Sequence, residues 1–169
     1  MKRGLLLSLL FVAGCSGGEP QPANNATAAT GLEAAAIEVG VIPDPNNTDI
    51  TGLYARDTDR VCIVPSATAY RIGVFVDYGD KVICGGSGTV TRAGEKLQLE
   101  FDGVDGCSFE ARFEGDRIVF PGNLPSACQK LCAQRASMAA LDVARLSESV
   151  SEASTLRDGK GKLLCSSGG

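Results

Sequence analysis

Apolar and polar residues alternate strictly along the middle of the chain. Residues 96–102 (KLQLEFD) and 107–114 (CSFEARFE) both place their apolar side chains at odd-numbered positions. This period of two is typical of strands that have one face on a core and the other in water. Short strands separated by turn residues are expected at 52–56, 60–65, 70–77, 81–85, 87–92, 95–102, 107–114 and 117–121.

The turns between these strands predict an antiparallel meander in which each strand pairs with the next. Turns at 93–94, 103–106 and 114–115 keep the apolar residues of four successive strands on one face. A slip by one residue would turn a strand's apolar face to water. The expected opposing pairs are Val90–Leu97, Leu97–Ala111, Leu99–Phe109, Phe101–Cys107, Phe109–Phe120 and Ala111–Ile118.

After Pro121 the apolar spacing changes to that of a helix. Ser126 and Gln129 fit the two ends of a capping box, in which Ser126 is the N-cap. Residues 136–146 continue with good helix formers, and a further short helix is expected at 150–157.

These patterns predict an α+β fold with a single domain over residues 50–169. Its first part, 50–121, is a β-meander of about seven or eight short strands, which must curl into a small barrel or a curled sheet because only one face is apolar. Its second part, 122–169, is a helical tail that a disulfide pins to the domain. Apolar residues make up 44% of the chain, which is enough for a core.

Charge and composition exclude several classes of function. The chain carries 16 basic and 20 acidic residues, and an acidic domain repels phosphate backbones, so we expect no nucleic-acid partner. It contains no histidine, the commonest general base and the commonest metal ligand. We therefore expect a protein that is not an enzyme and that binds no cofactor.

The N-terminus has the layout of an export signal. Two basic residues precede an apolar run over residues 4–13, which is too short to span a hydrocarbon core of about 30 Å as a helix. The run ends in residues 12–15 (VAGC), which resemble the lipobox of bacterial lipoproteins. The resemblance implies that residues 1–14 are removed as a signal peptide and that Cys15 carries fatty acyl chains such as palmitate. The alternative is an ordinary secretory signal with a chance cysteine.

Residues 15–49 are expected to form a tether between the lipid and the domain. Residues 16–30 (SGGEPQPANNATAAT) are small and polar and bury too little surface to offset their ordering entropy. Residues 32–39 (LEAAAIEV) predict one short helix, and 43–47 (PDPNN) marks the domain boundary. Ser16 follows the lipidation site in place of Asp, so the resemblance implies the periplasmic face of the outer membrane.

Six cysteines follow the lipidation site: Cys62, Cys84, Cys107, Cys128, Cys132 and Cys165. An even number outside the cytoplasm predicts three structural disulfides. We expect Cys84 to pair with Cys62 or Cys107 inside the sheet. The remaining strand cysteine then pairs with Cys128, and Cys132 pairs with Cys165. No metal site is expected, because zinc would need a second close cysteine pair or a histidine.

Acidic residues gather near the later turns: Asp102, Asp105, Glu110, Glu114 and Asp116. Two carboxylates held in a pocket can act as acid and base, and calcium prefers oxygen ligands. The alternation instead places Glu110 and Glu114 on the outward face, and Asp102 and Asp105 lie beside turn glycines. We therefore expect solvated carboxylates. The glycine-rich residues 84–88 lack the lysine of a phosphate loop and predict a bend between strands.

The functional expectation is a non-catalytic module, anchored by its lipid, that binds an envelope protein or a small apolar ligand. The alternative is an inhibitor of a secreted hydrolase such as lysozyme or a protease, because small disulfide-held β-barrels of that kind are known in bacteria. An exposed loop at 78–81 or 103–106 would favour the inhibitor. An enzyme that uses carboxylates alone is the third hypothesis and the least favoured.

Overall fold

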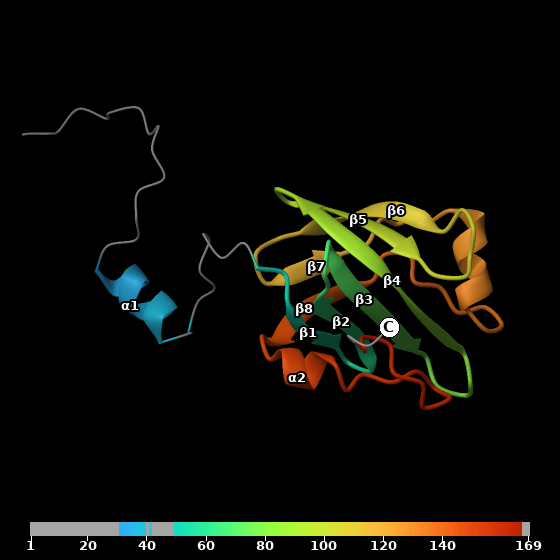
Figure 1. Ribbon diagram of the computed structural model, residues 1–169. Helices are drawn as coiled ribbons and strands as arrows, with labels where there is room; N and C mark the ends of the chain where they lie inside the picture. Colours follow the sequence, from blue (N-terminus) through green and yellow to red (C-terminus); the bar gives the residue numbers. More distant parts are fainter. Residues whose placement is uncertain (1–30, 40, 42–48, 167–169) are drawn as a thin grey trace, which may run out of the picture.

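The computed structural model describes residues 31–39, 41 and 49–166. Within these residues, eight antiparallel strands form a closed barrel in which each strand pairs with the next and β8 returns to pair with β1 (Figure 1). The strands are β1 Gly52–Arg56, β2 Asp59–Pro65, β3 Tyr70–Asp77, β4 Ile83–Ala93, β5 Lys96–Phe101, β6 Ser108–Phe113, β7 Arg117–Val119 and β8 Asp142–Ser147. The helices are α1 Leu32–Glu38, the 3-10 helix η1 Ser126–Leu131 and α2 Val150–Ala153. None of them is long and apolar enough to cross a membrane.

The expected α+β class is wrong, because the helices are small and the C-terminal part is not a pinned helical tail. The helix expected over 136–146 is absent, and Asp142–Ser147 forms β8 instead. Val143 is buried in the core, whereas Ala144 and Leu146 face outward. Because β8 pairs with both β7 and β1, it removes the two free edges that an open sheet would present.

The other helices agree with the sequence in part. The capping box at Ser126 is wrong, because Ser126 is the first residue of η1 and no side chain caps that end. At α2 the Ser149 side chain accepts a hydrogen bond from the backbone N–H of Glu152, so a short helix within 150–157 is confirmed. The short helix expected at 32–39 is confirmed as α1. Residues 1–30, which include the expected signal peptide and the expected lipidation site Cys15, lie outside the described residues.

The predicted pairing of β5 with β6 is confirmed by the opposing pairs Leu97–Ala111 and Leu99–Phe109. The pairing on either side is wrong by two residues, because Val90 lies opposite Leu99 and Ile118 lies opposite Phe113. A shift of two preserves the alternation, so every apolar residue still faces the expected side. The strands expected at 81–85 and 87–92 are one continuous strand, β4.

Side chains fill the interior of the barrel. Aromatic rings meet in the middle, where Phe101 stacks on Phe109 at a centroid distance of 5.9 Å and Phe109 meets Phe120 edge to face at 5.1 Å. The other large side chains that are fully buried include Tyr54, Phe113, Ile50, Ile63, Ile72 and Leu97. These buried side chains form a continuous core inside the barrel.

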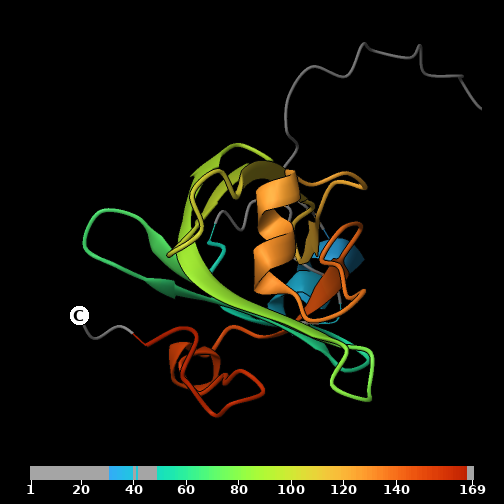
Figure 2. The same ribbon diagram turned by 90° about the vertical axis from the view of Figure 1, so that its right-hand side faces the viewer.

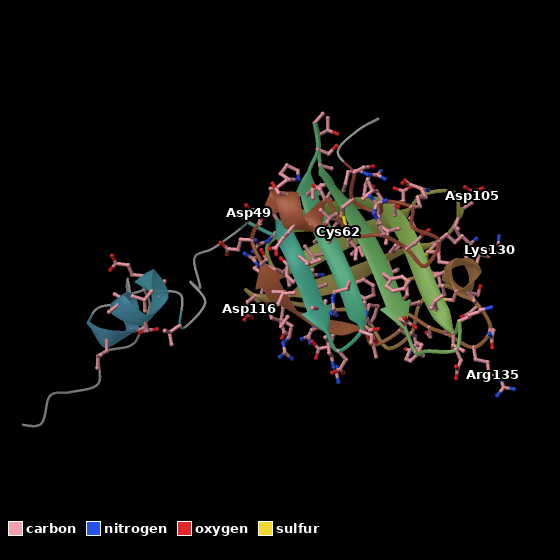
Figure 3. All side chains as sticks on the ribbon, turned by 90° about the horizontal axis from the view of Figure 1, so that it is seen from below. Asp49, Cys62, Asp105, Asp116, Lys130 and Arg135 are labelled. Atoms are coloured by element: carbon pink, nitrogen blue, oxygen red, sulfur yellow. A yellow bond between two sulfur atoms is a disulfide. The ribbon has the colours of Figure 1, made fainter. Side chains whose placement is uncertain are left out.

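The two ends of the barrel differ in construction. The entry end holds the start of β1, the end of β8 and the turns at 66–69, 94–95 and 114–116. The distal end holds the turns at 57–58, 78–82 and 102–107 and the long connection 120–141, which contains η1. Figure 3 shows Asp49 and Asp116 on the side of the entry end, and Asp105, Lys130 and Arg135 on the opposite side.

Arg145 closes the entry end. Its guanidinium carbon lies 5.4 Å from the centroid of the Tyr54 ring and 5.6 Å from that of Phe113, which is within cation–π range. Its Nη2 donates to the Tyr54 hydroxyl at 3.0 Å, and that hydroxyl donates to the Ile50 carbonyl at 2.8 Å. Burial raises the pKa of Tyr54 to about 12, although the charge of Arg145 acts in the opposite direction.

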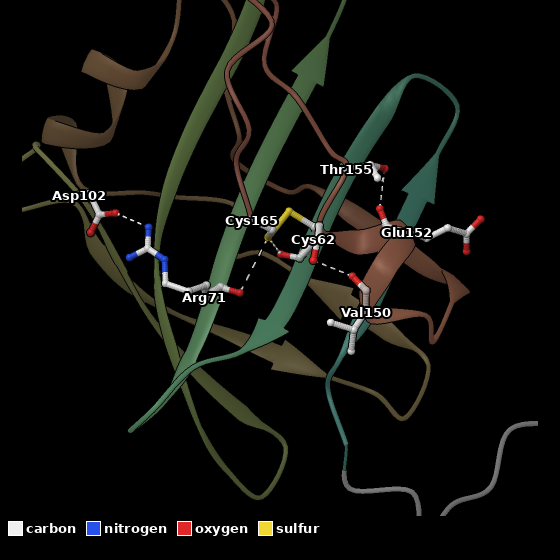
Figure 4. The surroundings of a disulfide bond; sticks show 8 residues. Cys62, Arg71, Asp102, Val150, Glu152, Thr155 and Cys165 are labelled. Carbon is white, nitrogen blue, oxygen red and sulfur yellow. Dashed lines mark hydrogen bonds and ion pairs between the residues drawn. A yellow bond between two sulfur atoms is a disulfide. The ribbon is translucent and has the colours of Figure 1, made fainter. Parts of the chain in front are cut away.

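Residues 148–166, which we call the strap, cover the outer face of β1, β2 and β3. Figure 4 shows the disulfide from Cys62 on β2 to Cys165 that fixes the strap. Ala153, Leu164 and Val64 complete a second small core outside the barrel. Gly73 lies under the strap, and a Cβ there would lie 2.7 Å from the Cys62 sulfur, so the close approach requires glycine.

Candidate functional site at the distal end

The helix η1 lies across the distal opening of the barrel. Figure 2 looks at this end, and η1 runs in front of the strands. Leu131 at the end of η1 packs toward Gly86 of β4 and Phe101 of β5, and a Cβ on Gly86 would come within about 3 Å of both side chains. The missing side chain of Gly86 therefore makes the space in which η1 is seated.

Two disulfides hold this connection on the barrel. Cys84 at the start of β4 bonds to Cys132, and Cys107 before β6 bonds to Cys128. The prediction of three disulfides is confirmed, and so is a strand cysteine bonded to Cys128. The expected pairs of Cys84 with a strand cysteine and of Cys132 with Cys165 are wrong. The reason is that Cys132 does not follow a long helix, and an extended backbone brings it against β4, where it forms a bridge with Cys84.

Backbone strain is concentrated at the distal end. The described residues include five non-glycine residues with positive φ: Asp57, Asp80, Lys81, Gln134 and Ala140. All five lie in distal connections, whereas the entry-end turns use Gly94 and Gly115 for this conformation. Such residues cost about 1–3 kcal/mol each and persist where the surrounding structure fixes them. Their clustering marks the distal end as the candidate functional surface.

Tyr78 is the exposed aromatic residue of this surface. The residue is 61% exposed, yet its hydroxyl donates to the Ser137 carbonyl at 3.0 Å. The turn that follows is closed by hydrogen bonds between Tyr78 and Val82 and between Val82 and Gly79. The ring is therefore fixed between two loops and offers a face to a partner without having to be ordered on binding.

The carboxylate of Asp59 lies beside the same loops. It accepts the backbone N–H of Asp77 at 3.2 Å, and the Thr58 hydroxyl donates to the Asp77 carbonyl at 2.6 Å. These bonds join the turn at 57–58 to the start of the turn at 78–82. Burial raises the pKa of Asp59, with the charge of Asp57 acting in the same direction.

The acidic residues singled out in the sequence do not form one site. Glu110 pairs with Lys96 and Glu114 with Arg112, both on the outer wall of the barrel. Asp102 pairs with Arg71 at 2.7 Å. Asp102 and Asp105 line an open hollow of about 500 Å³ beside the turn at 102–107, but the other three acids do not. No group of three acidic, cysteine or histidine side chains in the described part of the chain could hold a metal ion.

Sequence reasoning named the loop at 78–81 but missed what surrounds it. The residue types of the connection 120–141 predict helix, so the sequence did not indicate that this connection covers the end of the barrel. Arg145 was missed as well, although one signal exists. It lies two residues after Val143 on the same strand, so the alternation places both side chains on the inward face. The comparisons with protein families, with curated proteins and with solved structures find no match to this chain.

Proposed function

We propose that this protein is a lipid-anchored, non-catalytic module of the bacterial cell envelope that binds a protein partner with the distal end of its barrel. The observation that carries the proposal is that the two ends of the barrel differ in construction. The chain enters the domain at one end, and the disulfide-held, strained loops lie at the other. A tether attached at the entry end leaves the distal end pointing away from the anchor and free to meet a partner.

A protein partner is favoured over a small apolar ligand because the interior of the barrel is a packed core. The residues that would line a ligand cavity, such as Phe109, Ile118 and Leu99, contact one another instead. The hollow beside the distal turn at 102–107 is open and lined by polar groups, among them Asp102 and Asp105. Protein interfaces use exposed aromatic residues on fixed loops, which describes Tyr78.

A carboxylate-only enzyme is not favoured. Acid–base catalysis needs two carboxyl groups that a pocket holds together and that have different proton affinities. Glu110 and Glu114 instead form exposed ion pairs with basic neighbours on the outer wall. Asp102 is likewise engaged by Arg71.

The binding proposal is tested by the affinity of a partner recovered from the envelope by cross-linking. Replacing Tyr78 with Ala should weaken binding by about 2 kcal/mol or more, because the fixed ring is the anchor of the surface. Gln98→Ala on the outer wall is the matched control and should leave the affinity unchanged. An unchanged affinity for Tyr78→Ala, or an equal loss in both variants, contradicts a distal binding surface.

The anchor is tested by the intact mass of the protein from its native membrane, before and after reduction. We expect acyl chains on Cys15, loss of residues 1–14, and a mass gain of six hydrogen atoms on reduction, because each of the three disulfides takes up two electrons and two protons. Cys15→Ser should release the protein from the membrane fraction. Membrane retention of that variant contradicts the lipid anchor.

An inhibitor of a secreted hydrolase is the second candidate. The favouring observation is the turn at 78–82, where two successive non-glycine residues, Asp80 and Lys81, hold positive φ beside an exposed Tyr78. A convex loop fixed in one conformation suits insertion into an active-site cleft. Stoichiometric inhibition of a lysozyme or protease that Tyr78→Ala abolishes would select this version.

A further inference from the structure

We infer that the disulfide between Cys84 and Cys132 is a redox-sensitive bond whose opening loosens the turn at 78–82 while the barrel stays folded. This bond differs from the other two disulfides in its accessibility, in the segments that it joins, and in the backbone strain beside it. Its effect on binding rests on the distal surface proposed above, whereas its opening can be measured without a partner.

The three disulfides differ in their exposure to solvent. Cys132 is partly exposed. The other bonded cysteines are at most 2% exposed, and they are Cys62, Cys84, Cys107, Cys128 and Cys165. Cys132 also lines a hollow of about 240 Å³ beside η1. Thiol–disulfide exchange requires an attacking thiolate to reach a sulfur atom, so access limits its rate. The bond between Cys84 and Cys132 should therefore react first with an external thiol.

This bond joins the turn at 78–82 to the connection 120–141. Cys84 lies at the start of β4, directly after the turn, and Cys132 directly follows η1. Figure 2 shows the turn beside this connection. Two hydrogen bonds run alongside the disulfide, from the Ala133 N–H to the Ile83 carbonyl at 2.8 Å and from the Tyr78 hydroxyl to the Ser137 carbonyl at 3.0 Å. Water can replace either hydrogen bond, so the disulfide is the link that keeps the two segments together.

Backbone strain lies on both sides of the bond. Asp80 and Lys81 precede Cys84 with φ of 49° and 64°. Gln134 follows Cys132 with φ of 56°. Positive φ is unfavourable for residues with a side chain and persists where neighbouring contacts fix the backbone. Both segments can relax once the covalent link is broken, which favours the open form.

The opening reaction is an exchange with a dithiol, such as the paired cysteines of a thiol–disulfide oxidoreductase. A thiolate of the dithiol attacks the Sγ of Cys132, a new S–S bond forms to that sulfur, and the bond to Cys84 breaks. Cys84 leaves as a thiolate and takes up a proton. The second thiolate of the dithiol then displaces Cys132, which also takes up a proton. The dithiol is thereby oxidised to a disulfide, and the protein gains two electrons and two protons.

The connection that contains η1 stays on the barrel when the bond opens. Ala136 and Met138 are each 1% exposed within the core, and the bond from Cys107 to Cys128 still holds η1. The segment that becomes free to move is therefore the turn at 78–82, together with the few residues after η1.

Opening of the bond changes how Tyr78 is presented to a partner. With the bond closed, the ring is ordered before binding, because the turn cannot move away from Ser137. With the bond open, binding has to order the turn and the ring. Ordering one such side chain weakens affinity by about threefold to tenfold. The oxidised protein is therefore the form that binds more tightly.

The first test is the order in which the bonds open in the folded protein. The full chain carrying Cys15→Ser is treated with dithiothreitol without denaturant. Samples taken at intervals are acidified, unfolded and labelled with N-ethylmaleimide, and their peptides are mapped by mass spectrometry. Label should appear at Cys84 and Cys132 at least about tenfold faster than at the other four cysteines. Equal rates for all three bonds, or faster opening of the bond from Cys107 to Cys128, would overturn the inference.

The second test is hydrogen exchange in the variant with Cys84→Ala and Cys132→Ala, which represents the opened bond. The amides of Val82 and Ala133 should exchange at least about tenfold faster than in the parent chain, with no change in β5 and β6. Cys62→Ala with Cys165→Ala removes an equally buried pair under the strap and should leave both amides at the parent rate. Parent rates in the first variant, or faster exchange in β5 and β6 as well, would show that the bond does not control the turn.

The effect on binding is measured with a partner whose affinity depends on Tyr78. Affinity should fall by about threefold to tenfold when Cys84 and Cys132 are both replaced with Ala, and an unchanged affinity contradicts the control of binding by this bond. A partner that binds without Tyr78 contradicts the distal surface alone, because the order of reduction and the exchange rates involve no partner.

Discussion

Opening the disulfide between Cys62 and Cys165 should destabilise the domain more than opening either of the others. The perturbation is Cys62→Ala with Cys165→Ala. The bond spans 103 residues, and the loop-entropy relation gives about 4.7 kcal/mol for a loop of that size. The bond from Cys107 to Cys128 spans 21 residues, for which the same relation gives about 3.3 kcal/mol. A domain of this size has a free energy of unfolding of about 5–15 kcal/mol, so the loss is large.

The assay is urea unfolding followed by far-ultraviolet circular dichroism, because the chain has no tryptophan to report by fluorescence. The control is Cys107→Ala with Cys128→Ala, whose sulfurs are buried as well. The reasoning is refuted if the pair at 62 and 165 costs no more than the control pair. That result would mean that the strap detaches from the barrel before the barrel unfolds, and that the bond holds the strap in place without stabilising the barrel.

Three further predictions concern the barrel itself. Gly88→Ala should lower the free energy of unfolding by about 1–3 kcal/mol, because a Cβ there meets the Glu100 carbonyl and comes within 2.9 Å of the Phe101 Cα. At Gly85 a Cβ would meet no atom closer than 3.6 Å, so Gly85→Ala is the control and should leave thermal unfolding nearly unchanged. Tyr54→Phe should lower the free energy of unfolding in urea by about 1–3 kcal/mol, since it leaves the buried Ile50 carbonyl without its donor. An unchanged midpoint of urea unfolding would contradict the closure of the entry end. The raised pKa of Tyr54 means that its hydroxyl keeps its proton in the folded state at pH values where it has lost it in the unfolded state. The free energy of unfolding should therefore fall by about 1.4 kcal/mol per pH unit from pH 10 to about 12, and Tyr54→Phe should remove that slope.

The hairpins were predictable because strict alternation fixes which face of a strand is buried. The β5–β6 register followed directly from the turn at 103–106, with Leu99 opposite Phe109. The neighbouring registers differ by two residues because the alternation does not encode where a turn is centred: the two-residue turns are 94–95 and 115–116, each one residue later than expected. In β4–β5 the turn is tight, at Gly94, and this places Val90 opposite Leu99.

The closing strand was not predictable from local pattern. Asp142–Ser147 contains Arg145 at an inward position and Leu146 at an outward one, so its alternation is inverted relative to the usual burial of these residue types. Arg145 is tolerated inside because Tyr54 and Phe113 supply ring faces and Glu148 supplies a charge. Only the tertiary structure reveals those partners, which is why the segment looked helical.

The candidate site was predictable only as a loop. Tyr78-Gly79-Asp80 reads as a turn from its residue types, but the hydrogen bond from Tyr78 to Ser137 joins residues 59 positions apart. The same holds for the bond between Cys84 and Cys132, which depends on how the connection 120–141 crosses the barrel. Long-range contacts of this kind have no signature in the local spacing of residues.

The most direct test of a distal binding surface is site-specific photocross-linking in intact cells. A photoreactive phenylalanine analogue replaces Tyr78 at the distal end, Gln98 on the outer wall or Thr68 at the entry end, one position at a time. The account predicts a cross-link to one protein partner from position 78 and none to that partner from 98 or 68. Cross-linking of the same partner from 98 or 68, with none from 78, would contradict it.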